Sequence, residues 1–146
     1  MVNLSSEGIS FIDDRGKLVA FNDFSLEKIK RMYQIEHSDT SIIRAWQGHR
    51  VESKWFYVIS GSFTIGYVKI DDFITPSEKL IANYKNISVN DNKVLHIPAG
   101  YANGLKAIEP QSKLIIFSDL SLEEAKEDNY KFDSNLWLDW DDLKSI

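Results

Sequence analysis

The chain has 146 residues, a formal net charge of −5 and no cysteine, and 43% of its residues are hydrophobic. This length corresponds to about one globular domain, and the acidic balance argues against a nucleic-acid binder, whose domain would be basic. The absence of cysteine excludes disulfides and thiolate chemistry and fits a reducing compartment. We recognise no signal peptide and no apolar run long enough to span a bilayer, so we expect a cytoplasmic protein without a membrane partner.

Short segments with alternating or β-branched residues follow one another along the chain, separated by turn signals. Such segments predict strands. In chain order the expected strands are 8–12 and 17–21 as a hairpin, then 29–35, a strand carrying Gln47 and His49, 55–59, 62–70, the short segments 79–83 and 86–89, 94–97, 105–108 and 113–117. Ser121 and Glu124 have capping-box spacing, which predicts a short helix over Ser121–Lys126. Many short strands with one late helix indicate an all-β sandwich or barrel.

Polar side chains gather in the stretch from Ile42 to Gly61. Gln47 and His49 are two residues apart, so they point to the same side of an extended backbone. Lys54 lies across a short turn from them, and the next strand can return it to the same face. We expect any chemistry of the chain to start here.

Two further features supply candidate site residues. In the strand 29–35, Tyr33 shares its face with Arg31, so we expect Tyr33 to look into a pocket. A Pro/Gly corner over 98–104 changes the direction of the chain and contains Tyr101 and Asn103. The aromatic tail over 130–140 is expected to pack back on the body.

The chain contains two motifs whose residues have a defined spacing. Gln47-Gly48-His49 is followed after four residues by Lys54 and after six more by Gly61, and Pro98-Ala99-Gly100-Tyr101-Ala102-Asn103 comes later. The pattern resembles the two cupin signatures, His-x-His-x4-Glu-x6-Gly and Pro-x-Gly-x-x-His. The resemblance implies a single domain over 1–146 with a cupin-type jelly-roll barrel, a double-stranded β-helix, and a short C-terminal helix.

The positions that hold a metal in cupins carry other residues here. Three of the four are Gln47, Lys54 and Asn103, which leaves His49 alone. A lysine ammonium repels a divalent cation, and neutral amides are poor ligands for borderline metals. We therefore predict a cupin without a metal.

The chain is similar to two groups of metal-free cupins that act on nucleotide sugars. It resembles the dTDP-4-dehydrorhamnose 3,5-epimerases through Arg44-Ala45-Trp46-Gln47, Lys54 and the corner 98–104. It resembles the dTDP-4-keto-6-deoxyglucose 3,4-ketoisomerases through Lys30-Arg31-Met32-Tyr33 and the segment 44–50, where His49 is kept. The similarity extends from about Arg15 to Tyr130 and implies a homodimer that isomerises a nucleotide-linked 4-keto-6-deoxyhexose without a cofactor, in deoxysugar or polysaccharide biosynthesis.

Residue chemistry suggests a role for each candidate. A base next to a ketone needs a pKa near neutrality, which histidine has, so His49 is the expected base. Gln47, Tyr33 or Lys54 would stabilise or protonate the enediolate oxygen. The expected substrate-binding residues are Arg44, whose guanidinium can grip a diphosphate in a bidentate manner, together with Trp46, Asn103 and Tyr101.

Each candidate also has a purely structural interpretation. His49 is alternatively a hydrogen-bonded strand histidine, Arg44 and Lys54 surface charges, and Trp46 a core or dimer contact. We expect His37 to be solvated in a turn and His96 to be structural. The acidic tail Asp139–Asp142 is most simply a solvated end, although one of its aspartates is a further candidate to orient His49. Because Gln47 and Asn103 replace histidines, a catalytically inactive nucleotide-sugar-binding cupin is the alternative to an isomerase.

Overall fold

The computed structural model describes residues 1–143 of the chain, and almost all of its regular structure is β. The strands are β1 (Asn3–Glu7), β2 (Ile9–Asp13), β3 (Gly16–Ala20), β4 (Arg31–Glu36), β5 (Ile43–His49), β6 (Lys54–Ser60), β7 (Ser62–Lys69), β8 (Asn83–Ser88), β9 (Lys93–Ile97), β10 (Tyr101–Ala107), β11 (Lys113–Ser118) and β12 (Tyr130–Lys131). A 3-10 turn, η1 (Val89–Asp91), precedes β9, and the short helix α1 (Leu122–Lys126) follows β11. Ser121 caps α1 and forms the predicted capping box with Glu124.

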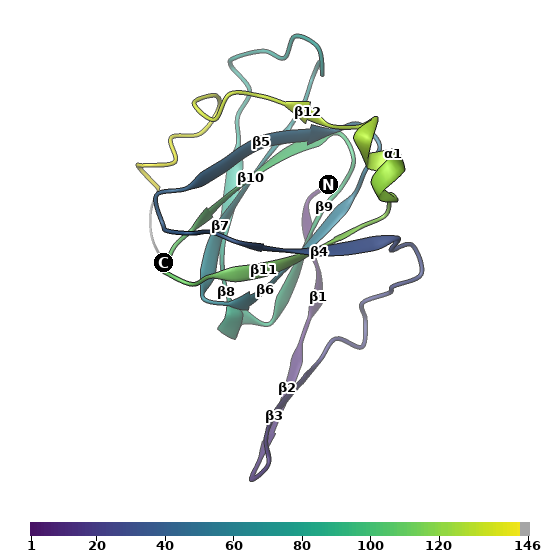
Figure 1. Cartoon of the computed structure of the whole chain (residues 1–146), viewed down its shortest axis with the longest axis vertical. Helices are drawn as coiled ribbons and strands as arrows, with labels where there is room; N and C mark the ends of the chain where they lie inside the picture. Colours follow the sequence, from purple (N-terminus) through teal and green to yellow (C-terminus); the bar gives the residue numbers. More distant parts are fainter. Residues whose placement is uncertain (144–146) are drawn as a thin grey trace.

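Two five-stranded antiparallel sheets form the body, in the orders β1-β9-β6-β11-β4 and β12-β5-β10-β7-β8 (Figure 1). The main core lies between them, because the strands alternate and direct one row of apolar side chains inward. Phe56 and Leu114 of the first sheet and Phe63, Ile65 and Leu105 of the second belong to this one buried cluster. The expected all-β jelly roll is confirmed.

The C-terminal segment covers the outer face of the second sheet, as expected for the aromatic tail. Trp140 belongs to a second apolar cluster there with Trp46. The tail packs closely because Gly66 and Gly104 are paired across β7 and β10 and have no side chains. A Cβ atom on Gly104 would lie 2.6 Å from the indole of Trp140.

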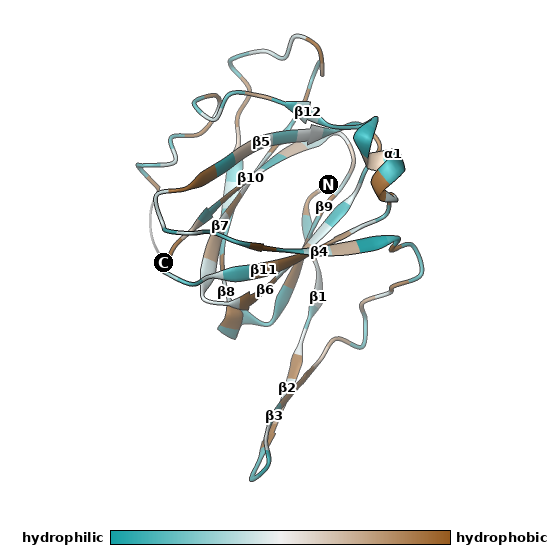
Figure 2. Cartoon of the chain, in the orientation of Figure 1, coloured by the Kyte–Doolittle hydropathy of each residue, from teal (hydrophilic) through white to brown (hydrophobic). Residues whose placement is uncertain are grey.

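A two-stranded hairpin, β2–β3, projects away from the body (Figure 1). The register pairs Ile9 with Ala20 and Phe11 with Leu18, which places these apolar side chains on one face. Apolar colour runs along the hairpin above its hydrophilic tip (Figure 2). The predicted hairpin is confirmed, and no other part of residues 1–143 covers its apolar face.

Three sequence-based expectations were wrong. The two short strands expected over 79–83 and 86–89 are a single strand, β8, and residues 79–82 belong to no strand. The corner predicted over 98–104 is shorter, because Gly100 turns the chain with a φ of +95° and Tyr101 already begins β10. Asn103 therefore lies in a sheet rather than in a corner. His37 is buried, with 4% of its surface exposed, and its ring packs edge-on against Phe63.

No helix within residues 1–143 has the length and apolar character needed to cross a lipid bilayer. The organisation as a single domain over 1–146 stays a prediction, and its last three residues lie outside the described range.

Candidate active site

A cavity of about 170 Å³ lies at one end of the two sheets, beside α1. The four residues predicted to be catalytic, Tyr33, Gln47, His49 and Lys54, all line it. They come from three strands: Tyr33 from β4, Gln47 and His49 from β5, and Lys54 from the start of β6. Residues of α1 and Asn129, which follows it, close another side. The structure thus brings Tyr33 together with Gln47, His49 and Lys54, the three residues that the sequence pattern placed on a common face.

His49 is buried, and one of its ring nitrogens has a defined partner. Its Nδ1 lies 2.7 Å from the backbone oxygen of Asp128. A carbonyl oxygen can only accept, so Nδ1 carries the hydrogen and the lone pair of the neutral ring is on Nε2. Nε2 is buried and has no hydrogen-bond partner within residues 1–143. This nitrogen is therefore free to take a proton from a ligand.

Glu52 lies against the same ring. Its Oε1 is 3.2 Å from His49 Nδ1, and its Oε2 accepts from Arg31 Nη2 at 2.9 Å. The hydroxyl of Ser118 also donates to Oε2. Arg31 is fixed in turn, because its Nε donates to the carbonyl of Leu120 at 3.2 Å. Arg31 and Ser118 thus hold Oε2 of Glu52 in place, and this directs Oε1 toward the imidazole of His49.

Lys54 is a buried cationic group that lines the cavity. Only 4% of its surface is exposed, and within residues 1–143 its ammonium forms no hydrogen bond or ion pair. It lies 5.7 Å from the centre of the Tyr33 ring, which Arg31 also approaches at 5.0 Å. A buried cation without a counter-ion attracts an anion or a developing negative charge.

The surroundings set the protonation of His49. Burial and the nearby Lys54 ammonium lower the pKa of His49, while the Asp128 carbonyl and the Glu52 carboxylate oppose them. The net direction is down, so the ring is neutral at pH 7 and able to act as a base.

The chain shares its architecture with solved structures of sugar-nucleotide enzymes, although no family model and no curated protein sequence matches it. The QdtA 3,4-ketoisomerase of Thermoanaerobacterium thermosaccharolyticum aligns with a TM-score of 0.70 and 20% identity, over 90% of this chain and 87% of that one. A dTDP-4-dehydrorhamnose 3,5-epimerase of Bacillus anthracis aligns at 0.72 and 16%, over 99% and 93%. The Mycobacterium tuberculosis rmlC epimerase aligns at 0.73 and 14%, over 92% and 72%. The chain has the cupin fold of these enzymes.

The cupin cavity of this chain does not fit a metal ion. His49, Glu52 and Asp128 have ligand atoms within 4.8 Å of one another, a spacing that would suit a cation. The Asp128 carboxylate, however, accepts three backbone N–H groups, and Glu52 is bound by Arg31 and Ser118. Arg31 would also repel a divalent ion. These side chains are engaged in holding the histidine.

The four residues predicted to bind substrate are not among those that line the cavity. Trp46 is a correction, because it is 1% exposed on the outer face of β5 and donates from Nε1 to the carbonyl of Leu136. It therefore presents no ring for stacking. Arg44 is exposed near the far end of β5. Tyr101 and Asn103 lie on β10 opposite His49 and Gln47, where Tyr101 packs on the main core.

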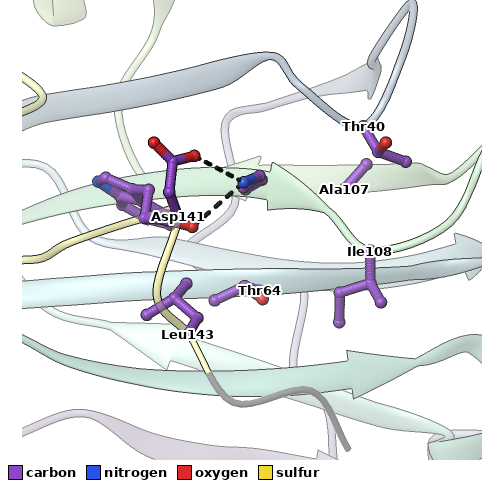
Figure 3. Close-up of a pocket in the computed structure, with 8 residues that line it drawn as sticks. Thr40, Thr64, Ala107, Ile108, Asp141 and Leu143 are labelled. Atoms are coloured by element: carbon purple, nitrogen blue, oxygen red, sulfur yellow. Dashed lines mark hydrogen bonds and ion pairs between the residues drawn. The ribbon is translucent and has the colours of Figure 1, made fainter.

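The acidic tail does not orient His49. Asp141 pairs with Lys106 at 3.4 Å beside a separate hollow of about 250 Å³, where Thr64 and Leu143 also contribute (Figure 3). Lys106 in addition donates to the backbone oxygen of Trp140 at 3.1 Å. The tail is thus fastened to the outer face of the cupin sheet, and the oxygens that contact the imidazole belong to Glu52 and Asp128.

Sequence reasoning missed three groups that shape the cupin site. Glu52 lies in an irregular turn, and nothing in a strand pattern marks a turn carboxylate as buried. Asp128 is distant in sequence from His49, so no spacing rule connects them. The α1 residues Leu122, Ala125 and Lys126 line the cavity, and the capping box that revealed the helix carries no sign of where the helix packs.

Proposed function

We propose that this chain is a sugar-nucleotide isomerase that moves protons next to the ketone of a nucleotide-linked 4-keto-6-deoxyhexose. The observation that carries the proposal is the buried Nε2 of a neutral His49 beside the Lys54 ammonium, neither of which has a polar partner within residues 1–143. The solved structures of similar fold support the substrate class, since one is a ketoisomerase in complex with TDP-4-keto-6-deoxyglucose and another an epimerase with dTDP-4-keto-L-rhamnose.

The chemistry needs a base and a group that stabilises an oxyanion. Nε2 of His49 removes the proton from the carbon next to the ketone, and negative charge develops on the ketone oxygen. Lys54, which has no anion of its own within residues 1–143, stabilises that oxygen, with Tyr33 and Gln47 as further hydrogen-bond donors. Glu52 stabilises the imidazolium that forms. Proton transfer of this kind requires no cofactor.

We propose ketone migration in preference to epimerisation. Within residues 1–143, His49 is the one histidine that lines the cavity. A single base can remove a proton from one carbon and return it to the neighbouring carbon on the same face. Epimerisation needs a separate acid on the opposite face, and in this cavity that task would fall to Tyr33.

The volume of the cavity suits the sugar rather than the whole substrate. Pockets for drug-sized ligands span roughly 300–1,000 Å³, and this one measures about 170 Å³. The nucleotide would therefore lie beyond the rim. Lys126 lines the cavity with an exposed side chain, pairs with Glu123 at 3.5 Å, and would be the residue that meets a diphosphate.

We also propose that the protein forms a homodimer. The hairpin β2–β3 carries an apolar face that nothing else in residues 1–143 covers, with Phe11 and Leu18 each 58% exposed. A second copy of the chain would bury it.

NMR of dTDP-4-keto-6-deoxyglucose in D₂O, with and without the protein, tests the function. Deuterium at C4 of a 3-keto product supports ketone migration, whereas deuterium at both C3 and C5 of a 4-keto product identifies an epimerase. His49→Asn should slow exchange by about 10²–10⁴-fold. His96→Asn is the matched control, because His96 stacks on Trp55 outside the cavity. Saturable binding without exchange would overturn the proposal in favour of a binding protein.

A further inference from the structure

Asp128 connects two parts of the active site through its side chain. The residue is 5% exposed and follows α1 by two positions. Its carboxylate accepts hydrogen bonds from three consecutive backbone N–H groups, those of Arg50, Val51 and Glu52, at 2.8, 2.9 and 2.8 Å. These donors belong to the turn that leads from β5 to β6. Three donors satisfy a buried carboxylate without a cation.

The main chain of the same residue holds the base. The carbonyl oxygen of Asp128 accepts from Nδ1 of His49 at 2.7 Å. The turn gripped by the carboxylate also delivers Oε1 of Glu52 to within 3.2 Å of that nitrogen. Asp128 therefore fixes the His49 ring directly through its carbonyl oxygen. Through the backbone of the turn it also fixes the Glu52 carboxylate, which lies beside the ring.

We propose that Asp128 is a positioning residue that keeps the hydrogen of neutral His49 on Nδ1, so that Nε2 presents its lone pair to the ligand, and that couples this state to the α1 side of the cavity. Its consequence for turnover rests on the proposed function. The state of the ring does not, because it exists in the free protein.

The coupling to α1 follows from the contacts around the cavity. Leu122, Ala125 and Lys126 line the cavity, and Asp128 comes two residues after the helix ends. At its other end the segment is tied to β4, where Arg31 donates to the carbonyl of Leu120. A ligand that presses on α1 therefore acts on the carbonyl that holds the imidazole.

A simpler role for Asp128 is to stabilise the turn alone. In that case removing the carboxylate would lower the melting temperature and leave the imidazole unchanged. In our proposal, loss of the three hydrogen bonds to the Asp128 carboxylate lets the Asp128 carbonyl move away from His49. The Nδ1 hydrogen is then no longer held, and the ring populates both neutral tautomers.

The test is ¹⁵N NMR of the histidine rings in the full-length protein at a pH where His49 is neutral. His49→Asn assigns the signals. In the native protein we expect Nδ1 to be protonated and Nε2 to be bare, and in Asp128→Asn we expect a mixture of tautomers. Asp119→Asn is the matched control, since Asp119 accepts one backbone N–H, that of Ser53 at 2.9 Å, and does not contact His49.

Two results would overturn the proposal: a hydrogen on Nε2 in the native protein, or an unchanged Nδ1-protonated ring in Asp128→Asn. The first needs no variant and so holds even where Asp128→Asn fails to fold. Asp128→Glu then gives the second comparison, because it keeps the charge but shifts the carboxylate relative to the carbonyl.

Turnover separates this proposal from the proposed function. If the protein catalyses deuterium exchange, Asp128→Asn should lower kcat by about 10²-fold with a smaller change in KM, because a base displaced by about 1 Å loses that much. If no sugar is turned over, the proposed function fails while the tautomer measurement still decides the role of Asp128.

Discussion

Oε1 of Glu52 lies 3.2 Å from Nδ1 of His49, three residues earlier in the chain, while its Oε2 is held 2.9 Å from Arg31. A carboxylate in this position favours the imidazolium that forms when the ring takes up a proton. It also raises the pKa of His49 against the larger effect of burial, which lowers it. Glu52 thus makes a deeply buried histidine a usable base.

Glu52→Gln should slow solvent exchange into the substrate by about ten- to a hundredfold. The charge that favours the imidazolium is lost, so the pKa of His49 falls further and the acidic limb of the pH profile, where the base loses its proton, moves to lower pH. The pH dependence of kcat/KM measures this displacement. Glu36→Gln is the control, because Glu36 pairs with Lys113 at 3.4 Å on the surface. An unshifted pH profile in Glu52→Gln would remove Glu52 from the mechanism.

The part of the site that lies on strands was predictable from the sequence. Gln47 and His49 alternate on β5, and Tyr33 shares a face with Arg31 on β4, so period-2 patterning alone put each pair on one face of its strand. The all-β class was predictable for the same reason, whereas the jelly roll was implied by the resemblance to the cupin signatures. Trp46 was misassigned although its direction could be inferred: it alternates with Gln47 and so points away from the cavity, where the C-terminal segment covers it.

The period-2 pattern of the sequence could not predict the positions of Asp128 and His37. Asp128 contacts His49 across 79 positions in the sequence, and only the docking of α1 brings them together. His37 follows β4 in what reads as a polar turn. It is buried because it packs on Phe63, a contact set by the arrangement of the strands and by no local signal.

Lys54→Met should stabilise the fold and abolish turnover. The native side chain is 4% exposed and has no anionic partner within residues 1–143, so the fold bears the cost of a desolvated charge. Replacing it by an apolar side chain of similar length should raise the free energy of unfolding by about 1 kcal/mol or more. Urea denaturation measures the change.

Lys69→Met controls for the loss of a lysine at an exposed position on β7 and should change stability by less than about 0.5 kcal/mol. A destabilised Lys54→Met protein would show that the ammonium has a partner that holds the fold together, and the assignment of Lys54 to the reaction would fail.

The stability of the protein should fall as the pH drops below the ordinary pKa of histidine. Burial, with Arg44 as the next cause, lowers the pKa of His37 in the folded state. Above pH about 6.5 the group is neutral in both states. Below pH about 6.5, His37 is protonated in the unfolded chain but stays neutral in the folded chain. The free energy of unfolding therefore declines by up to about 1.4 kcal/mol per pH unit, until the pH reaches the pKa of His37 in the folded state.

The pKa values of His49 and His96 are also lowered by burial, so all three histidines act in the same direction. His37→Leu removes one of them. It should stabilise the protein more at pH 5 than at pH 8, as measured by urea denaturation at both values. An equal change at the two values would mean that His37 titrates alike in both states.

The exposed hairpin leads to the last prediction. Phe11 and Leu18 are register partners on one face, and Ile12, 77% exposed, lies on the other. If a second copy buries the first face, the double variant Phe11→Ser, Leu18→Ser should be a monomer by light scattering while the native chain is a dimer. Ile12→Ser removes a comparable apolar side chain from the opposite face and should stay a dimer. A native chain that scatters as a monomer at all concentrations would contradict the proposed homodimer, and a double variant that stays dimeric would place the interface elsewhere on the cupin.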